Sequence, residues 1–211
     1  IEILANDLRI QTLAGELVAY EQDLALQPSD PLPVKSPQYT AITEKYQRFC
    51  RNFIESYGFS DLSVVAADSG HLLFSTAGES DLGAGFASAI YAGNGKAEAW
   101  RRASRTGAAT IVDFAPYQPS SNRESAFIAH PVFNLDRDLL AVVILQIHPA
   151  FINEIMDSRK GMGKTGESYL ISWSAEKGRF SFRSDMRTMG DGRYTVGYSL
   201  DKRLQYWHDA V

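Results

Sequence analysis

The chain has one cysteine and no long apolar run. Cys50 has no partner for an intramolecular disulfide, and its apolar neighbours Phe49 and Phe53 indicate a buried structural thiol rather than a nucleophile. The longest apolar run, residues 139–145, has the length of a strand and is much shorter than the roughly 18 residues that a membrane helix needs. The sequence printed above therefore predicts neither a disulfide framework nor a membrane span.

The sequence also lacks the common catalytic and metal-binding motifs. It contains no G-x-S-x-G turn and no H-E-x-x-H helix, and Cys50 has no histidine nearby in sequence. The histidines at positions 71, 130, 148 and 208 do not have the spacing of metal ligands. We therefore expect no enzyme, no metal and no cofactor, with an unrecognised hydrolase as the remaining catalytic alternative.

Basic residues are not in excess. The net charge of −4 and the pI of 5.6 argue against a nucleic-acid partner, because no basic face is available to neutralise phosphates. The densest cationic group, Arg101, Arg102 and Arg105, falls on one predicted helix and is typical of a solvated helix face. The content of 45 % hydrophobic and 22 % charged residues is that of an ordinary globular protein.

Gly163-Lys164-Thr165 invites comparison with a phosphate-binding loop of the form G-x-x-x-x-G-K-[ST]. Ser158 stands where that pattern requires glycine. A phosphate-binding loop also follows a strand and opens a helix, so that backbone amides surround the phosphate. Here a predicted helix comes before the loop and a predicted strand after it, so the sequence does not predict a nucleotide site.

Apolar periodicity predicts two helices at the N-terminus. Apolar residues recur at helical spacing over residues 1–26 and again over Tyr39–Tyr57. Four prolines between residues 28 and 37 form a connection that no helix can cross. Neither helix has a preceding sheet to cover, which favours a helical stalk or dimer seam over residues 1–60.

The pattern then changes to short strands. Two strands joined by the tight turn Asp68-Ser69-Gly70, a helical segment within Gly83–Arg105, and three more antiparallel strands follow in order. This order predicts an α+β fold in which a PAS-like antiparallel five-stranded sheet with flanking helices occupies residues 61–157. The predicted strands are Leu62–Ala67, His71–Thr76, Ala109–Phe114, Ser125–Val132 and Leu139–Ile147, and a helix over Ala150–Asp157 follows them.

Residues 158–211 contain too few strands for a complete second PAS-like module. The pattern predicts strands over Ser168–Trp173 and Arg179–Ser184, and the tail from Tyr198 can begin another helix. We therefore expect a second, smaller or truncated PAS-like module in this part of the chain.

Four segments of the sequence form an ordered set of motifs: residues 113–120, residues 126–132, residues 161–171 and Arg183-Ser184-Asp185. These motifs resemble those of double Cache sensor domains, the extracytoplasmic ligand-binding parts of bacterial transmembrane receptors. The resemblance spans about Gly58 to Asp185. It implies periplasmic exposure at the inner membrane, a homodimer through the N-terminal helices, and flanking transmembrane helices, which a chain opening at Ile1 without methionine would lack. The output would be a chemotaxis, histidine kinase or cyclase module.

In a PAS-like module, a small-molecule pocket lies between the sheet and the opposite helices, and such pockets are mostly apolar with a few convergent polar groups. Tyr117, held between Pro116 and Pro119, either offers its phenol to a ligand or packs on the sheet edge. Asp113 either anchors a cation or caps the loop, and Arg101 either grips a carboxylate or is solvated. The candidate ligand-binding residues are Tyr91, Trp100, Arg101, Asp113, Tyr117, Phe127, His130 and Gln146.

The resemblance also bears on the ligand. Amino-acid-binding members carry a tyrosine-arginine-tryptophan-tyrosine signature, near which Trp100 and Arg101 fall, and a sheet aspartate that pairs with the ligand's ammonium. Gln146 stands in place of that aspartate, and an amide does not offset a buried ammonium. We therefore expect a small carboxylate or neutral metabolite rather than a free amino acid, unless Asp113 substitutes. The alternative function is a ligandless spacer that sets dimer geometry.

Overall fold

The computed structural model describes the chain except for residues 92, 158–161, 163–165, 175–177, 187–193 and 200–211. The chain divides into two compact units, Ile1–Ile147 and His148–Val211. The division expected from the sequence, at residues 60 and 157, differs from this one. Packing joins the N-terminal helices to the sheet, and it groups the helix after the last sheet strand with the second unit.

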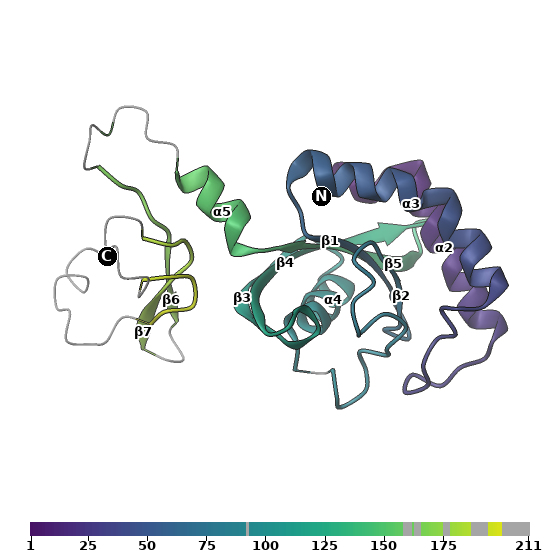
Figure 1. The fold of residues 1–211 in the computed structure, drawn as a ribbon. Coiled ribbons are helices and arrows are strands. Elements are labelled where there is room, and N and C mark those ends of the chain that lie inside the picture. The colour runs from purple at the N-terminus through teal and green to yellow at the C-terminus, as the bar shows by residue number, and fades with distance from the viewer. Residues whose placement is uncertain (92, 158–161, 163–165, 175–177, 187–193, 200–211) are drawn as a thin grey trace. The chain divides into compact units, whose positions relative to one another are not determined.

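The first unit is built on a five-stranded sheet of antiparallel pairs with strand order β2-β1-β5-β4-β3 (Figure 1). Two strands, a helix and three further strands follow one another as predicted for a PAS-like module, so the α+β fold class is confirmed. The strands are β1 (Asp61–Ala66), β2 (Leu72–Ser75), β3 (Thr110–Tyr117), β4 (Arg123–Phe133) and β5 (Leu139–Ile147).

One face of the sheet is covered by the N-terminal helices α1 (Glu2–Ala5), α2 (Leu8–Asp23) and α3 (Pro37–Tyr57). The single helix predicted over residues 1–26 is broken, because the carboxylate of Asp7 accepts a bond from the amide of Arg9 and starts a new helix there. Ile10, Leu13, Ala14 and Leu17 of α2 are fully buried and belong to the same cluster as inward residues of β1 and β5. The two long helices therefore do have a sheet to cover.

The opposite face carries α4 (Gly95–Thr106), which lies in the curve of the sheet in Figure 1. The Asn94 side chain caps the start of α4 by accepting a bond from the amide of Ala97 at 2.7 Å. Ala97, Ala99 and Ala103 are fully buried, so the helix backbone approaches the sheet closely. The core on this face also includes Leu72, Phe86, Val142 and Ile144.

Gly83 and Gly85 lie between β2 and α4 and are held against the proline-rich connection before α3. The amide of Leu32 donates to the carbonyl of Gly83 at 2.8 Å. Gly85 touches the same connection so closely that a Cβ atom there would lie 1.9 Å from the carbonyl oxygen of Pro28. Only glycine fits at position 85 without moving backbone.

We therefore expect Gly85→Ala to lower the free energy of unfolding by about 1–3 kcal/mol, the usual cost of overpacking. The matched control is Gly15→Ala, because Gly15 lies within α2 and a Cβ atom there meets no atom within 4 Å. That substitution should raise stability by up to about 1 kcal/mol through helix propensity. Urea unfolding measures both changes, and equal stabilities for the two variants would contradict the close approach at Gly85.

The third strand runs further than its sequence pattern predicts. The pairing of β3 with β4 shifts between Val112 and Ala115, as in a β-bulge, and the strand then continues through Pro116 to Tyr117. A short 3-10 turn, η1 (Gln118–Ser120), leads into β4. Tyr117, predicted in a loop, is therefore the last residue of a strand, and its side chain is 1 % exposed.

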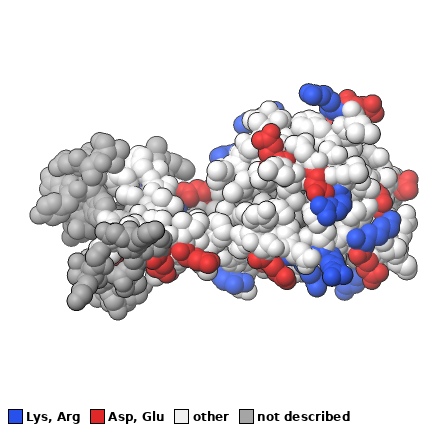
Figure 2. Space-filling model, turned by 90° about the horizontal axis from the view of Figure 1, so that it is seen from above, with Lys and Arg blue, Asp and Glu red and all other residues white. Residues whose placement is uncertain are grey.

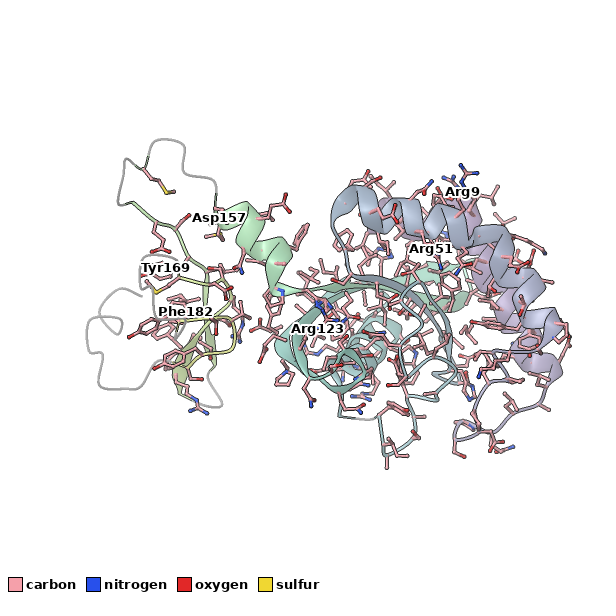
Figure 3. The ribbon with its side chains drawn as sticks, in the orientation of Figure 1. Arg9, Arg51, Arg123, Asp157, Tyr169 and Phe182 are labelled. Carbon is pink, nitrogen blue, oxygen red and sulfur yellow. The ribbon has the colours of Figure 1, made fainter. Side chains whose placement is uncertain are left out.

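The second unit contains α5 (Pro149–Met156) and the antiparallel hairpin of β6 (Ile171–Ser174) and β7 (Arg179–Phe182). Phe182 is 1 % exposed and packs against Tyr169 with ring centroids 5.7 Å apart, and both residues are labelled in Figure 3. Both strands predicted in this part of the chain are present, although β6 begins at Ile171 rather than Ser168 and β7 ends at Phe182 rather than Ser184. Gly163-Lys164-Thr165 and most of the predicted tail helix lie outside the described residues. Among the described helices, none is long and apolar enough to cross a bilayer.

Candidate functional site

A group of polar side chains is buried between the sheet and α4, and we call it the buried polar cluster. It forms where the first turn of α4 and residues 76–94 meet the end of the sheet that bears Tyr117. Every member except Glu79 is at most 8 % exposed, which is unusual for so many polar groups. Its members are Asp61, Ser63, Ser75, Glu79, Asp81, Lys96, Tyr117, Ser120, Ser125 and Gln146.

Lys96 lies at the centre of the buried polar cluster. Its Nζ lies 3.2 Å from Oδ2 of Asp61 and 3.4 Å from Oδ2 of Asp81, and 5.2 Å from the ring centroid of Tyr117. Burial alone would lower the pKa of Lys96, but the negative charges of Asp61, Asp81 and Glu79 outweigh it and raise the pKa. Lys96 is therefore a cation and a hydrogen-bond donor, and it has no free lone pair for nucleophilic attack.

Asp61 is satisfied by its neighbours on β1 and β2. Its Oδ1 accepts bonds from Ser75 Oγ at 2.9 Å, Thr76 Oγ1 at 2.8 Å and the amide of Ala77 at 3.0 Å, and Ser63 donates to Oδ2. Burial raises the pKa of Asp61, but the charge of Lys96 and these hydrogen bonds act more strongly and lower it. Asp61 is therefore an ionised group with a complete set of partners.

Asp81 and Glu79 are less completely bonded than Asp61. The phenol of Tyr117 donates to Oδ2 of Asp81, and the hydroxyl of Ser120 donates to Oε1 of Glu79. The other oxygens, Asp81 Oδ1 and Glu79 Oε2, are buried and have no hydrogen-bond partner. Burial, followed by the charge of Asp81, raises the pKa of Tyr117 far above its usual value, so the phenol keeps its proton and remains a donor.

Three of the predicted residues meet at the buried polar cluster. Tyr117 and Phe127 pack edge to face with ring centroids 5.0 Å apart. The amide nitrogen of Gln146 donates to Ser120 Oγ at 2.8 Å and to Ser125 Oγ at 3.1 Å. Tyr91 packs against Phe86, at 6.2 Å between ring centroids, and lies in the segment that leads to α4.

Four more of the predicted residues lie outside the buried polar cluster. The indole of Trp100 donates to the carbonyl of Ala66 at 2.9 Å, which fixes the ring against the β1–β2 turn. Arg101 is exposed on α4. Asp113 is exposed in the bulge of β3 and its carboxylate accepts a bond from the amide of Phe114, which is the capping alternative. His130 contacts the carbonyl of Pro131, and strand alternation points it away from the face of Phe127.

Sequence reasoning missed Lys96, Asp61, Asp81 and Glu79. One signal was available for Lys96, since it shares a helical stripe with Trp100 and Ala103 at spacings of four and seven, and this stripe faces the sheet. For Asp61, the alternation of Asp61, Ser63 and Val65 along β1 places the carboxylate on the inner face. Asp81 and Glu79 lie in an irregular segment, where no periodicity predicts burial.

The remaining chemistry of the described residues is modest. Burial raises the pKa of Cys50 to about 12, so this thiol is a structural residue, as predicted. Within the described ranges, no group of three or more histidine, cysteine, aspartate or glutamate side chains is placed to hold a metal ion. On the face drawn in Figure 2, cationic and anionic side chains alternate and no single charge dominates.

The second unit has a cavity of about 230 Å³ beside α5. Asp185 of the Arg-Ser-Asp motif borders it and is bonded to Asn153 of α5 through both its amide, at 2.8 Å, and its carboxylate, at 2.7 Å. Ser184 is fully buried and accepts a bond from the amide of Leu170. The motif therefore ties α5, β6 and β7 together within this unit.

The comparisons with known proteins were made at the level of sequence and of structure. No family model matches the chain, and no curated protein matches it in sequence. The ligand-binding domain of the Pseudomonas fluorescens chemoreceptor CtaA, in complex with L-serine, is 15 % identical, with a TM-score of 0.46, over 93 % of this chain and 72 % of that chain. The sensor domain of the V. cholerae histidine kinase DctB is 14 % identical, with a TM-score of 0.39, over 88 % of this chain and 87 % of that chain.

A structure named methyl-accepting chemotaxis protein X is 16 % identical, with a TM-score of 0.48, over 95 % of this chain and 76 % of that chain. The first two of these structures are a ligand-binding domain of a chemoreceptor and a sensor domain of a histidine kinase. The likeness concerns the general fold and says nothing about the ligand of this chain.

Proposed function

We propose that this chain is the extracytoplasmic ligand-sensing part of a bacterial transmembrane receptor, and that residues 1–147 bind a small polar metabolite at the buried polar cluster. The observation that carries the proposal is the cluster itself. Burying one ammonium group and two carboxylates, with a third carboxylate half-buried beside them, costs free energy that an apolar core of the same volume would not cost. A binding site for a polar ligand accounts for this expense, and pockets with a few convergent polar groups are the usual form of such sites.

The position of the buried polar cluster also suits a sensor. Residues 76–94 supply Asp81 and Glu79 and, through Gly83, are bonded to the connection that leads into α3. A ligand that binds one arrangement of this segment better than another shifts the populations of the two. Such a shift would reach the helices on the other face of the sheet through the same connection.

The homodimer through the N-terminal helices, the flanking membrane helices and the extracytoplasmic location are parts of this proposal. The inward faces of α2 and α3 are used by the sheet, so a dimer would use their outer surface. Ile3 of α1 and Leu8, the first residue of α2, are 90 % and 71 % exposed and provide apolar area for such a contact. The sequence by itself predicts a carboxylate or neutral ligand rather than a free amino acid.

A thermal-shift screen of the whole chain tests the proposal. The panel contains amines, carboxylates, neutral polyols and amino acids. A compound that binds only the folded protein stabilises it by about 2.7 kcal/mol at one hundred times its Kd, which is roughly 5–10 °C for a protein of this size. We expect Tyr117→Phe to weaken the response, because the variant loses the phenol that contacts Asp81. His130→Gln is the matched control and should retain the response.

The outcome separates the alternatives. If no class of compound raises the melting temperature, the proposed sensor function is wrong and the ligandless spacer is favoured. If the response is unchanged in Tyr117→Phe and lost in His130→Gln, a ligand binds on the other face of the sheet. Turnover of a compound during the screen would favour the hydrolase alternative.

A further inference from the structure

Two buried carboxylate oxygens in the described part of the chain have no hydrogen-bond partner, and both belong to the buried polar cluster. They are Oδ1 of Asp81, a fully buried residue, and Oε2 of Glu79. Leaving a buried acceptor unsatisfied costs about 1–3 kcal/mol, and more for a charged group. Native proteins leave few such atoms, and each needs a physical explanation.

The charges of the buried polar cluster point in the same direction. Asp61, Asp81 and Glu79 carry three negative charges, and Lys96 carries one positive charge. Arg123, labelled in Figure 3, donates to the carbonyl of Ser120, but this side chain is exposed and its charge is solvated. An anionic ligand would therefore enter a site that is already negative.

We propose that the ligand of the buried polar cluster carries a primary ammonium or amidinium group, and that this group is received by Asp81 Oδ1 and Glu79 Oε2. Such a group has only donors and a positive charge, which are the two properties that the unpartnered oxygens lack in their surroundings. This inference rests on the proposed function and names the chemical class of its ligand. It revises the expectation of a carboxylate or neutral ligand, because that expectation was based on Gln146 and Asp113 and did not include Asp81 and Glu79.

Lys96 does not provide this missing partner. Its Nζ lies near Oδ2 of both Asp61 and Asp81, and Asp81 Oδ1 remains without a donor although Lys96 is present. A metal ion is a poorer candidate than an ammonium group, because these carboxylates are not arranged as a metal site in the described residues. Asp81 and Lys96 are fully buried, so the site is enclosed in the structure.

Matched compounds that differ only in their end groups test the inference on the whole chain. They are butane-1,4-diamine, butane-1,4-diol and butanedioate, together with ethanolamine, ethylene glycol and glycolate. Calorimetry and thermal shift at about pH 7 should detect at least one of the two amines and neither the corresponding alcohol nor the carboxylate. For an amino acid found in the wider screen, loss of binding on N-acetylation supports the inference and retained binding contradicts it.

Substitution of the two acceptors locates the site. Asp81→Asn and Glu79→Gln should each weaken amine binding by about tenfold or more, because each removes a charge-assisted bond. Asp136→Asn is the control, since Asp136 is exposed in the β4–β5 turn and lies outside the cluster. Glu79 is only half-buried, so Glu79→Gln keeps the test open if Asp81→Asn does not fold.

The failures are distinguishable. Stabilisation by carboxylates or diols alone would overturn the cationic ligand and leave the sensor function standing. If no class of compound in the panel binds or raises the melting temperature, both the cationic ligand and the sensor function are wrong. Amine binding that survives both substitutions would place the amine elsewhere and overturn the assignment to Asp81 and Glu79.

Discussion

Replacing Lys96 by methionine is expected to lower the free energy of unfolding by about 3–5 kcal/mol, the usual cost of removing one partner of a buried ion pair. The substitution leaves Asp61 and Asp81 facing each other without the ammonium group between them. Asp61 retains its hydroxyl and amide donors, so most of the loss falls on Asp81, whose remaining partner is the phenol of Tyr117. Methionine has a similar volume, so cavity formation contributes little.

Thermal unfolding measures this effect, and a shift of roughly 6–20 °C corresponds to that range of free energy for a protein of this size. Arg105→Met is the matched control, because Arg105 is a cation in the last turn of the same helix and is exposed. Its loss removes only a favourable interaction with the helix dipole, typically below 1 kcal/mol. The difference between the two variants isolates the contribution of burial.

A second substitution tests whether the lost stability comes from the uncompensated charge of Asp81. In the double variant Lys96→Met/Asp81→Asn the uncompensated charge of Asp81 is gone, so part of the stability should return. If Lys96→Met instead unfolds at the temperature of the original protein, the ammonium group is not holding the two carboxylates together. The same conclusion would follow if the double variant lost more free energy of unfolding than the two single variants lose together.

Much of the fold can be predicted from the sequence, because the spacing of apolar residues and the turn sequences determine where the strands of the sheet begin and end. Short apolar segments in β1, β4 and β5, bounded by polar turns such as Asp68-Ser69-Gly70, place those strands within two residues of their observed bounds. The N-terminal helices were less predictable. Their amphipathic stripes are evident, but a stripe does not say whether it faces a sheet later in the chain or a second subunit.

The site is harder to predict from sequence than the fold. Tyr117, Phe127 and Gln146 lie on strands, and their positions on one face follow from the strand order. Asp81 and Glu79 lie in an irregular segment, and its burial depends on Gly83 and Gly85 fitting against the proline-rich connection. That contact joins residues about fifty positions apart and leaves no periodic trace.

The second large effect concerns His71, a fully buried residue beside the helices on the opposite face of the sheet. Its Nδ1 lies 2.5 Å from Oε1 of Glu21 on α2, and its Nε2 lies 2.8 Å from the carbonyl oxygen of Asp30. Both partners are acceptors, so both ring nitrogens donate and the ring is an imidazolium. The bond that His71 donates to Glu21 raises the pKa of His71, and the carbonyl and carboxylate of Asp30 add to this rise against the opposing effect of burial.

This geometry makes the stability of the first unit depend on pH in a defined direction. Because the pKa of His71 is higher in the folded than in the unfolded chain, its stabilisation is complete below the unfolded value of about 6.5. It is lost as pH rises through the higher folded pKa. His71→Gln should therefore cost about 3 kcal/mol at pH 6, and the difference from the original protein should shrink towards pH 9.

Urea unfolding of both proteins between pH 6 and pH 9 measures that difference, and Glu21→Gln shows whether α2 is the partner. In a double-mutant cycle the coupling between positions 71 and 21 should be largest at pH 6 and fall along with the stability difference. A difference that stays constant across this range would mean that the ring is neutral and acts only through packing. A difference that grows with pH would reverse the sign and contradict an imidazolium between Glu21 and Asp30. An imidazolium at His71 links α2 to the segment that carries Asp81, because His71 also pairs with Gly85 through an isolated β-bridge. Loss of the His71 proton at alkaline pH is therefore expected to loosen the enclosure of the buried polar cluster.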